Sequence, residues 1–206
     1  MAPSSSAEPP LASADVESLL DIADRAVVDG LLGGLPSATP LPLLPAALRE
    51  HAGVFVTLTV DGELNGCIGT IEGVEPLGHG AARHAWSAAF ADPRLPALRR
   101  VDYEHLVIEV SVLSRVSPMP AASRGELVGA LRPGVDGLVI AAGAQRGVFL
   151  PAVWEQLPEA GAFVDHLQLK AGLSPRWWRA GTRAWRFTAT KHARRAGERP
   201  TPSQAA

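Results

Sequence analysis

The segment that most constrains the fold is an Asp-Gly dipeptide between two β-rich runs. Residues 54–60 read VFVTLTV, Asp61-Gly62 follows, and residues 64–71 continue as LNGCIGTI. β-Branched and aromatic residues favour strands, and Asp-Gly is a preferred sequence for a two-residue hairpin turn. The sequence therefore predicts an antiparallel hairpin over these residues.

A two-residue turn would also set the register of this hairpin. Val60 would face Glu63, and an uninterrupted ladder would then place Val56 opposite Cys67 on the same face. Because both faces of the hairpin carry apolar side chains, we expect both faces to be covered.

The remaining helices and strands do not follow a βαβ order. Apolar residues recur at helical spacing over 13–30, and an alanine-rich stretch over 76–91 also indicates a helix. Further strands are predicted at 106–113, 137–142, 147–151 and 184–190, and short helices at 153–157 and 163–171. This order favours an α+β fold with largely antiparallel sheets.

The two ends of the chain differ in composition from the rest. Residues 1–12 are mostly Pro, Ser and Ala, and we predict that they are disordered. The folded domain is expected over 13–191. Residues 192–206 are basic, then contain Pro and Ser, and we predict a disordered tail there.

Composition excludes several classes of protein. The chain has 206 residues, of which 47% are hydrophobic and 19% charged, so it can bury a globular core. A formal net charge of −2 gives no general attraction for phosphate, and we expect no nucleic-acid partner. One cysteine cannot form an intramolecular disulfide. Without a secretory pattern or a run of about 18 apolar residues, we expect a cytoplasmic protein with no membrane partner.

Six motifs along the chain resemble those of a known family. They are LNGCIG (64–69), AAFADPRLPAL (88–98), IEVSVLS (108–114), LRPGVDGLVI (131–140), FLPAVWEQLP (149–158) and HLQLKAGL (166–173). In this order and spacing they are similar to the motifs of the AMMECR domain family, whose hexapeptide reads LRGCIG. The resemblance covers roughly residues 50–190.

This resemblance implies an α+β fold of two subdomains, each a largely antiparallel sheet flanked by helices, with a cleft between them near the hexapeptide. The smaller subdomain is expected within about residues 118–165. Prokaryotic members occur beside a Memo-like protein and a radical SAM protein, so the resemblance implies these as possible partners, and we expect a bacterial member. It implies no particular reaction.

The sequence departs from the family pattern at two positions. Asn65 replaces the arginine of the hexapeptide, which removes a fixed charge and a bidentate donor. Gln168 stands where many members carry a second cysteine, so a two-thiol mechanism cannot operate here.

Cys67 is the first candidate for chemistry, and it has three interpretations. A thiol beside a cation or a base can act as a nucleophile or a metal ligand. On an apolar strand face, a cysteine is usually a small buried hydrophobic residue. It could also line a binding site, because Gly66 and Gly69 would let a substrate or another backbone segment approach closely.

Five further polar residues complete the candidate site. Asp92 and Arg94 follow a predicted helix, where they could form an ion pair, and Glu109 interrupts an otherwise apolar strand. His166 and Lys170 are spaced i, i+4, so they share one face of a predicted helix and could contact an anionic ligand.

The histidines do not predict a metal site. His79 and His84 are five residues apart, so on a helix they point in different directions, unlike the i, i+4 pair that binds zinc. The sequence identifies no cofactor.

Our leading hypothesis is a protein that binds a small molecule beside residues 64–69 and acts with a Memo-like or radical SAM partner. The contacts would come from Asn65, Gly66, Cys67 and Gly69, with Arg94 and Glu109 as polar contacts, as named above. One alternative is a cysteine-dependent enzyme in which Cys67 attacks a substrate and His166 acts as the base. The other is a non-catalytic protein-interaction module.

Overall fold

The computed structural model describes residues 10–176, 178–179 and 181–198, and the chain forms two compact units. The larger unit extends to Leu113 and takes up the chain again from Thr190. The smaller unit comprises Ser114–Ala189. The predictions of disorder for residues 1–9 and 199–206 lie outside the described residues.

The larger unit contains a four-stranded sheet and the long helices of the protein. Its sheet has the order β2-β1-β3-β8, and β1 is antiparallel to both neighbours. Asp61 has a φ of 52° and Gly62 a φ of 86°, the left-handed conformations that a tight two-residue turn needs, so the predicted hairpin is confirmed. In chain order its elements are α1 (Ser13–Leu31), η1 (Leu41–Leu43), α2 (Ala46–Arg49), β1 (Val54–Val60), β2 (Glu63–Thr70), α3 (Leu77–Phe90), η2 (Arg100–His105), β3 (Leu106–Leu113) and β8 (Ala189–Arg195).

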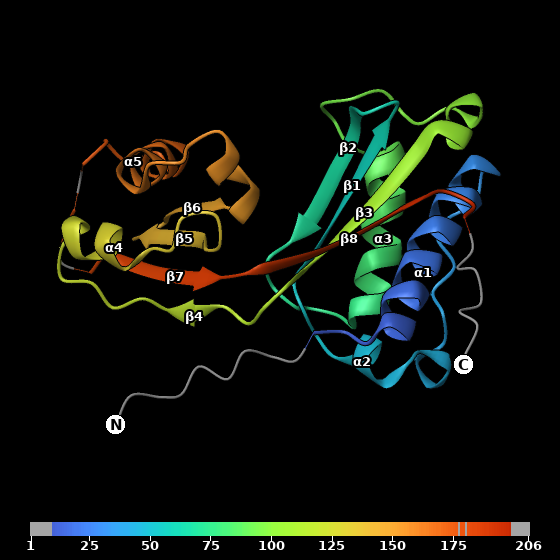
Figure 1. Ribbon diagram of the computed structural model, residues 1–206, viewed down its shortest axis with the longest axis horizontal. Coiled ribbons are helices and arrows are strands. Elements are labelled where there is room, and N and C mark those ends of the chain that lie inside the picture. Colours follow the sequence, from blue (N-terminus) through green and yellow to red (C-terminus); the bar gives the residue numbers. More distant parts are fainter. Residues whose placement is uncertain (1–9, 177, 180, 199–206) are drawn as a thin grey trace, which may run out of the picture. The chain divides into compact units, whose positions relative to one another are not determined.

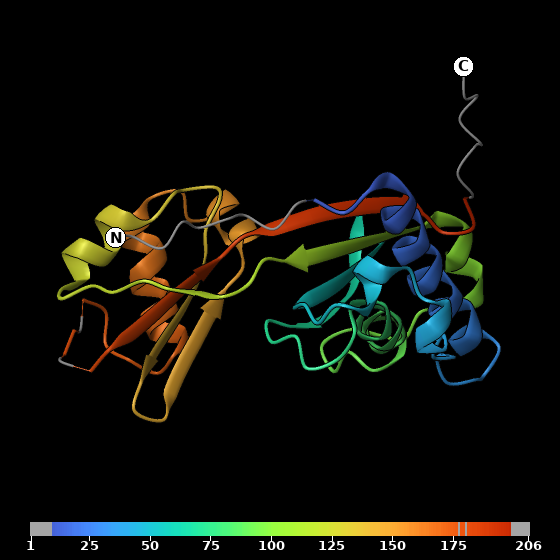
Figure 2. The same cartoon turned by 90° about the horizontal axis from the view of Figure 1, so that it is seen from below.

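Helices α1 and α3 cover one face of this sheet (Figures 1 and 2). In β1, the buried residues Val54, Val56 and Leu58 alternate with half-buried Phe55 and Thr57. Alternate residues of a strand point to opposite faces, so the first set meets the two helices. The second set lies on the face away from α1 and α3, which we call the polar face.

The smaller unit is a second α+β unit. Its sheet has the order β4-β7-β5-β6, and the pairs β4–β7, β5–β7 and β5–β6 are antiparallel; the turned view of Figure 2 shows β5, β6 and β7 side by side. Its elements are β4 (Ser117–Pro118), α4 (Arg124–Ala130), β5 (Gly137–Ala142), β6 (Gln145–Phe149), η3 (Pro151–Glu155), α5 (Ala160–Lys170) and β7 (Arg183–Phe187).

The core of the smaller unit lies between its sheet and helices α4 and α5. Leu138 and Ile140 of β5 pack with Leu127 of α4 and with α5. The ring of Trp154 stacks on that of Phe163 of α5, with centroids 3.8 Å apart and planes 5° from parallel. Each unit therefore buries its own apolar cluster, and the predicted α+β fold with antiparallel sheets is confirmed.

Three boundaries differ from the prediction. The smaller unit extends to Ala189 rather than ending near residue 165, because β7 pairs with β5 and completes its sheet. The expected last strand at 184–190 is two strands, β7 and β8. Residues 192–195, predicted as part of a disordered tail, belong instead to β8, which runs to Arg195, and Arg194 forms ion pairs with Glu17 and Asp21 of α1.

Among the described residues, no helix has both the length and the apolar character that a membrane crossing requires.

Candidate functional site

A β-bulge in the first hairpin decides where Cys67 lies. Thr59 pairs with Leu64, but Leu58 pairs with Gly66, so Asn65 is an extra residue in β2. Cys67 therefore faces Thr57, and the predicted pairing of Cys67 with Val56 is wrong. A shift of one residue moves a side chain to the other face of a sheet, so the thiol lies on the polar face instead of the apolar one.

The thiol of Cys67 has a hydroxyl group as its neighbour. Thr57 Oγ1 donates a hydrogen bond to Cys67 Sγ at 3.3 Å, and the cysteine is half-buried. The two residues face each other directly across the ladder. They form a non-hydrogen-bonded pair, because the N–H and C=O groups of Cys67 bond to side chains outside the sheet and not to Thr57. In an antiparallel ladder, side chains lie closest together in pairs of this kind.

Polar side chains continue from Cys67 across the whole sheet. Thr57 of β1 lies opposite Cys67 of β2 on one side and Glu109 of β3 on the other. Glu109 Oε1 lies 3.6 Å from Lys191 Nζ of β8 and accepts a hydrogen bond from Ser111 Oγ at 3.4 Å. A thiol, a hydroxyl, a carboxylate and an ammonium group thus follow one another on four neighbouring strands. We call Cys67, Thr57, Glu109 and Lys191 the polar row.

Asp92 and Arg94 hold the backbone of Cys67 from outside the sheet. Cys67 N–H donates to Asp92 Oδ2 at 3.0 Å, and Arg94 Nη2 donates to the Cys67 carbonyl oxygen at 2.7 Å. Arg94 also donates from Nε and Nη2 to both Asp92 oxygens, at 2.9 and 2.7 Å. Because β2 is an edge strand, the pair takes the place that a further strand would occupy.

The Asp92–Arg94 pair is asymmetric in its exposure. The Asp92 side chain is 2% exposed, whereas that of Arg94 is 60% exposed. The hydrogen bonds from Arg94 and from the Cys67 N–H hold the pKa of Asp92 well below its usual range. Asp92 is therefore an ionised, buried anchor, and Arg94 keeps guanidinium surface available to a ligand.

The two glycines of the hexapeptide lie against the protein's own atoms. A Cβ atom at Gly66 would lie 1.9 Å from the carbonyl oxygen of Ala88, so the glycine lets α3 approach β2. A Cβ atom at Gly69 would lie 2.3 Å from the ring of Phe55. Both glycines thus allow another segment of this chain to approach closely. This was one of the two roles predicted for them, the other being close approach of a substrate.

Asn65 has an unusual environment at the bulge. Its Oδ1 atom is buried and has no hydrogen-bond partner among the residues that the structure describes. A buried acceptor without a partner is costly, so the bulge places this amide oxygen in an unfavourable environment.

The other predicted residues, His166 and Lys170, belong to the smaller unit. On α5, His166 is exposed and its Nδ1 contacts the Ala162 carbonyl oxygen at 2.9 Å. Lys170 Nζ donates to the Val148 carbonyl oxygen at 3.0 Å and lies 5.2 Å from the centre of the Phe149 ring. The larger unit therefore brings together Cys67, Asp92, Arg94 and Glu109, whereas Lys170 holds α5 to β6 and the contact of His166 stays within α5.

Three residues of the site, Thr57, Ser111 and Lys191, were not among those predicted from the sequence. The alternation in VFVTLTV could have identified Thr57, because it places the threonines on the opposite face of the strand from Val54, Val56 and Leu58. Lys191 had no such signal, since only the pairing of β8 with β3 brings it to Glu109.

No cluster of three or more His, Cys, Asp or Glu side chains within the described ranges could hold a metal ion.

The fold and the site define a class of protein: two α+β units, with a capped edge strand that presents one thiol in a polar row. Comparison with known proteins identifies the family. The sequence profile of the AMMECR1 family matches residues 20–192, and the chain belongs to this family.

Relatives and a solved structure agree with this assignment. A protein of Methanothermobacter thermautotrophicus is 37% identical over 182 residues, which cover 87% of this chain and 94% of that protein. A protein of Thermofilum pendens is 37% identical over 193 residues, 86% of this chain and 89% of its own. The crystal structure of the uncharacterised Pyrococcus horikoshii protein PH0010 matches with a TM-score of 0.82 and 30% identity, covering 92% and 96% of the two chains. These three relatives are archaeal and give the expectation of a bacterial member no support.

Proposed function

We propose that this protein binds a small polar molecule on the polar face of its larger unit, beside residues 64–69. The observation that carries the proposal is the polar row, in which Cys67, Thr57, Glu109 and Lys191 lie on four adjacent strands. A sheet face that served only for packing would carry apolar side chains at these positions.

The chemistry of the row indicates the kind of ligand. Glu109 accepts hydrogen bonds and Lys191 donates them, and their side chains are 29% and 46% exposed, so each can exchange its partner for a ligand. Arg94 adds donors at the edge of the sheet. A ligand with both an anionic and a hydrogen-bond-donating group would satisfy all of these atoms.

The test is a thermal-shift screen of small polar metabolites against the intact protein. A ligand of the site should raise the melting temperature of the wild type, and the shift should be lost in Glu109→Gln and Lys191→Gln. The matched control is Arg99→Gln, which alters an exposed ion pair of the same unit and should keep the shift. A shift that survives both row substitutions would contradict the proposal.

A second candidate is an enzyme in which Cys67 acts as the nucleophile. The contact that favours it is the hydrogen bond from Thr57 to Cys67 Sγ, which orients the thiol on the half-buried polar face. An activated cysteine should react with iodoacetamide faster in the native protein than in the urea-unfolded protein. Slower reaction in the native protein would leave Cys67 as a binding residue.

The family resemblance adds a partner to the proposal. We propose that the bound molecule is exchanged, in the cytoplasm, with a Memo-like or radical SAM protein. The experiment is co-purification of each candidate with the wild type and with Cys67→Ser. Loss of the complex in Cys67→Ser would make the polar row part of the interface. A complex that survives, without any small-molecule ligand, would favour a non-catalytic interaction module instead.

A further inference from the structure

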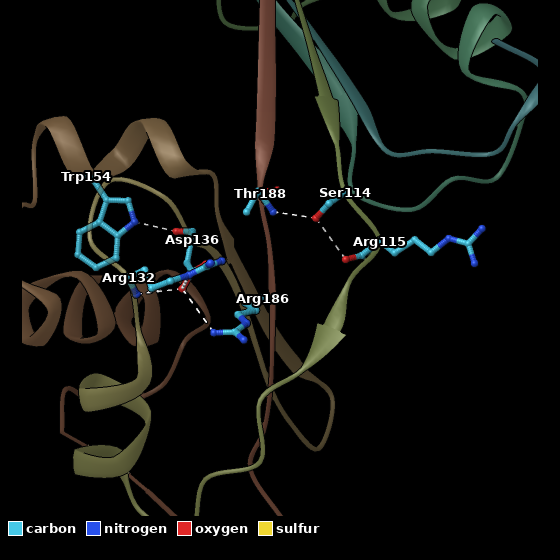
Figure 3. Close-up of polar contacts among 7 residues, drawn as sticks. All are labelled: Ser114, Arg115, Arg132, Asp136, Trp154, Arg186 and Thr188. Atoms are coloured by element: carbon cyan, nitrogen blue, oxygen red, sulfur yellow. Dashed lines mark hydrogen bonds and ion pairs between the residues drawn. The ribbon is translucent and has the colours of Figure 1, made fainter. Parts of the chain in front are cut away.

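The smaller unit holds a buried carboxylate between two arginines (Figure 3). The Asp136 side chain is 0% exposed, and it accepts hydrogen bonds from Arg132 N at 2.9 Å, Nε at 3.0 Å and Nη2 at 2.6 Å. Arg186 of β7 approaches the same carboxylate, with Nη1 4.0 Å from Asp136 Oδ2. All three residues belong to the same unit.

The backbone holds this cluster in place. Asp136 N–H donates to the Arg132 carbonyl oxygen at 3.1 Å, while Arg132 N–H donates to the Asp136 carboxylate, so the loop between them is closed at both ends. Trp154 Nε1 donates to the Asp136 carbonyl oxygen at 2.7 Å, and Trp154 is itself stacked on Phe163. The cluster is therefore formed before any ligand arrives.

The charges of the cluster do not balance. Two guanidinium groups face one carboxylate, which leaves a positive charge. The Arg132 side chain is 54% exposed and that of Arg186 is 36% exposed. A guanidinium has five N–H groups. Arg132 directs Nε and Nη2 to Asp136, and Arg186 lies beyond hydrogen-bond distance from it, so donors of both arginines remain for an anion.

The ion pair between Arg124 and Asp165 of the same unit differs from the Asp136 cluster in its balance of charge. Arg124 of α4 donates to Asp165 of α5 at 2.6 Å, and the two side chains are 22% and 25% exposed. In that pair one guanidinium group faces one carboxylate, and the two side chains are shielded from solvent to a similar extent. A structural role for Asp136 would need only Arg132, so it does not account for Arg186.

We propose that Arg132 and Arg186 form a binding site for an oxyanion, the phosphate or carboxylate group of a small molecule. Arginine guanidinium groups bind such groups in bidentate fashion. This site is independent of the polar row, since it is built from residues of the smaller unit alone.

The experiment is isothermal titration calorimetry of the full chain with inorganic phosphate and, separately, with acetate, at low ionic strength. The wild type should bind at least one of them saturably. Arg186→Gln should weaken binding by roughly tenfold or more, because it removes charge-assisted hydrogen bonds. The matched control is Arg183→Gln, which removes the same charge from the same strand and should leave the affinity within about twofold.

The two probes distinguish the sources of the anion. Preference for phosphate would indicate a phosphorylated ligand, and preference for acetate a carboxylate ligand. Because Arg186→Gln could also disturb the sheet, Arg186→Lys serves as a second variant. It keeps the charge, removes the planar fork and should still weaken binding. No saturable binding at millimolar concentrations, or equal loss in Arg183→Gln, would overturn the proposal.

Discussion

Each unit contains a nearly inaccessible aspartate that holds an arginine whose side chain is more than half exposed. In the larger unit these are Asp92 and Arg94, and in the smaller unit Asp136 and Arg132. Both carboxylates accept two hydrogen bonds or more from the arginine side chain. Asp92 also accepts from the backbone N–H groups of Cys67 and Arg94, and Asp136 from that of Arg132. Their contacts beyond the pair differ.

Asp92 bonds to a backbone group that lies far away in the sequence, whereas Asp136 bonds within its own loop. The Cys67 N–H group is 25 residues before Asp92, and this contact closes the edge of a sheet. Asp136 accepts from Arg132 only four residues away and has a second arginine beside it. The same side-chain pair therefore positions a strand in one unit and leaves an excess of positive charge in the other.

The largest expected effect is that of removing either aspartate. Asp92→Ala leaves the Cys67 N–H group without its partner and Arg94 with only the Cys67 carbonyl oxygen, and Asp136→Ala removes the partner of Arg132. Because several charge-assisted hydrogen bonds are lost, each substitution should cost about 2–4 kcal/mol of unfolding free energy. Urea denaturation measures the loss. Amide hydrogen exchange should increase at Cys67 in Asp92→Ala only.

The control for both variants is Asp102→Ala, which removes the partner of the exposed Arg99 and should change stability little. If the three variants lose similar amounts of unfolding free energy, burial of the aspartate does not determine how much each ion pair contributes to stability.

His84 of α3 extends the comparison to a buried polar group that is not fully paired. It is 3% exposed, and its Nδ1 has no hydrogen-bond partner in the part of the chain that the structure describes. Burial lowers the pKa of His84 from 6.5 to about 4. The positive charge of Arg83 lowers this pKa further, and the negative charge of Glu75 partly opposes the decrease.

The unfolded chain therefore binds a proton at His84 more readily than the folded protein does. The free energy of unfolding should therefore be unaffected by His84 above about pH 6.5 and should decrease as the pH falls toward about 4. The decrease that His84 causes is at most about 3 kcal/mol. Urea denaturation between these pH values measures it. The corresponding part of the pH dependence should vanish in His84→Gln, and an unchanged slope would show that other groups cause it.

Gly66 tests whether the position of α3 sets the contact of Asp92 with the edge strand. Asp92 follows α3 by two residues, and a Cβ atom at Gly66 would collide with the Ala88 carbonyl oxygen. Gly66→Ala should destabilise the protein by about 1–3 kcal/mol in urea denaturation, because the helix must move.

Gly129 of α4 offers the matched control, since a Cβ atom there would have no neighbour within 4 Å. Gly129→Ala should be neutral or stabilising by up to about 1 kcal/mol, as alanine is the better helix former. Equal losses in the two variants would argue against close packing at Gly66.

The smallest expected effect concerns the partly exposed pair of the polar row. Because Glu109 and Lys191 both contact solvent, Lys191→Gln should change the free energy of unfolding by less than about 1 kcal/mol. Thermal denaturation measures this change. A loss as large as that of Asp92→Ala would mean that the row serves stability and would remove the main support for ligand binding.

Most elements were predictable from local sequence, for reasons that are themselves local. β1 occupies the predicted residues 54–60, and β3 and β5 also match, because β-branched runs bounded by turn residues have few other ways to pair their backbone groups. The turn at Asp61-Gly62 follows from the left-handed conformations that these residues tolerate. Cys67, Asp92, Arg94 and Glu109 were identified as candidates in the same way, from their places in motifs.

The arrangement of those candidates depended on tertiary structure. Hairpin propensity cannot locate the bulge at Asn65, since that position also depends on how closely α3 approaches Gly66, and the bulge alone moves Cys67 to the polar face. The contact of Asp92 with Cys67 and that of Lys191 with Glu109 join residues that only folding brings together. Local sequence determines which residues can form strands and helices, but register and the neighbours across a sheet result from the packing of distant segments.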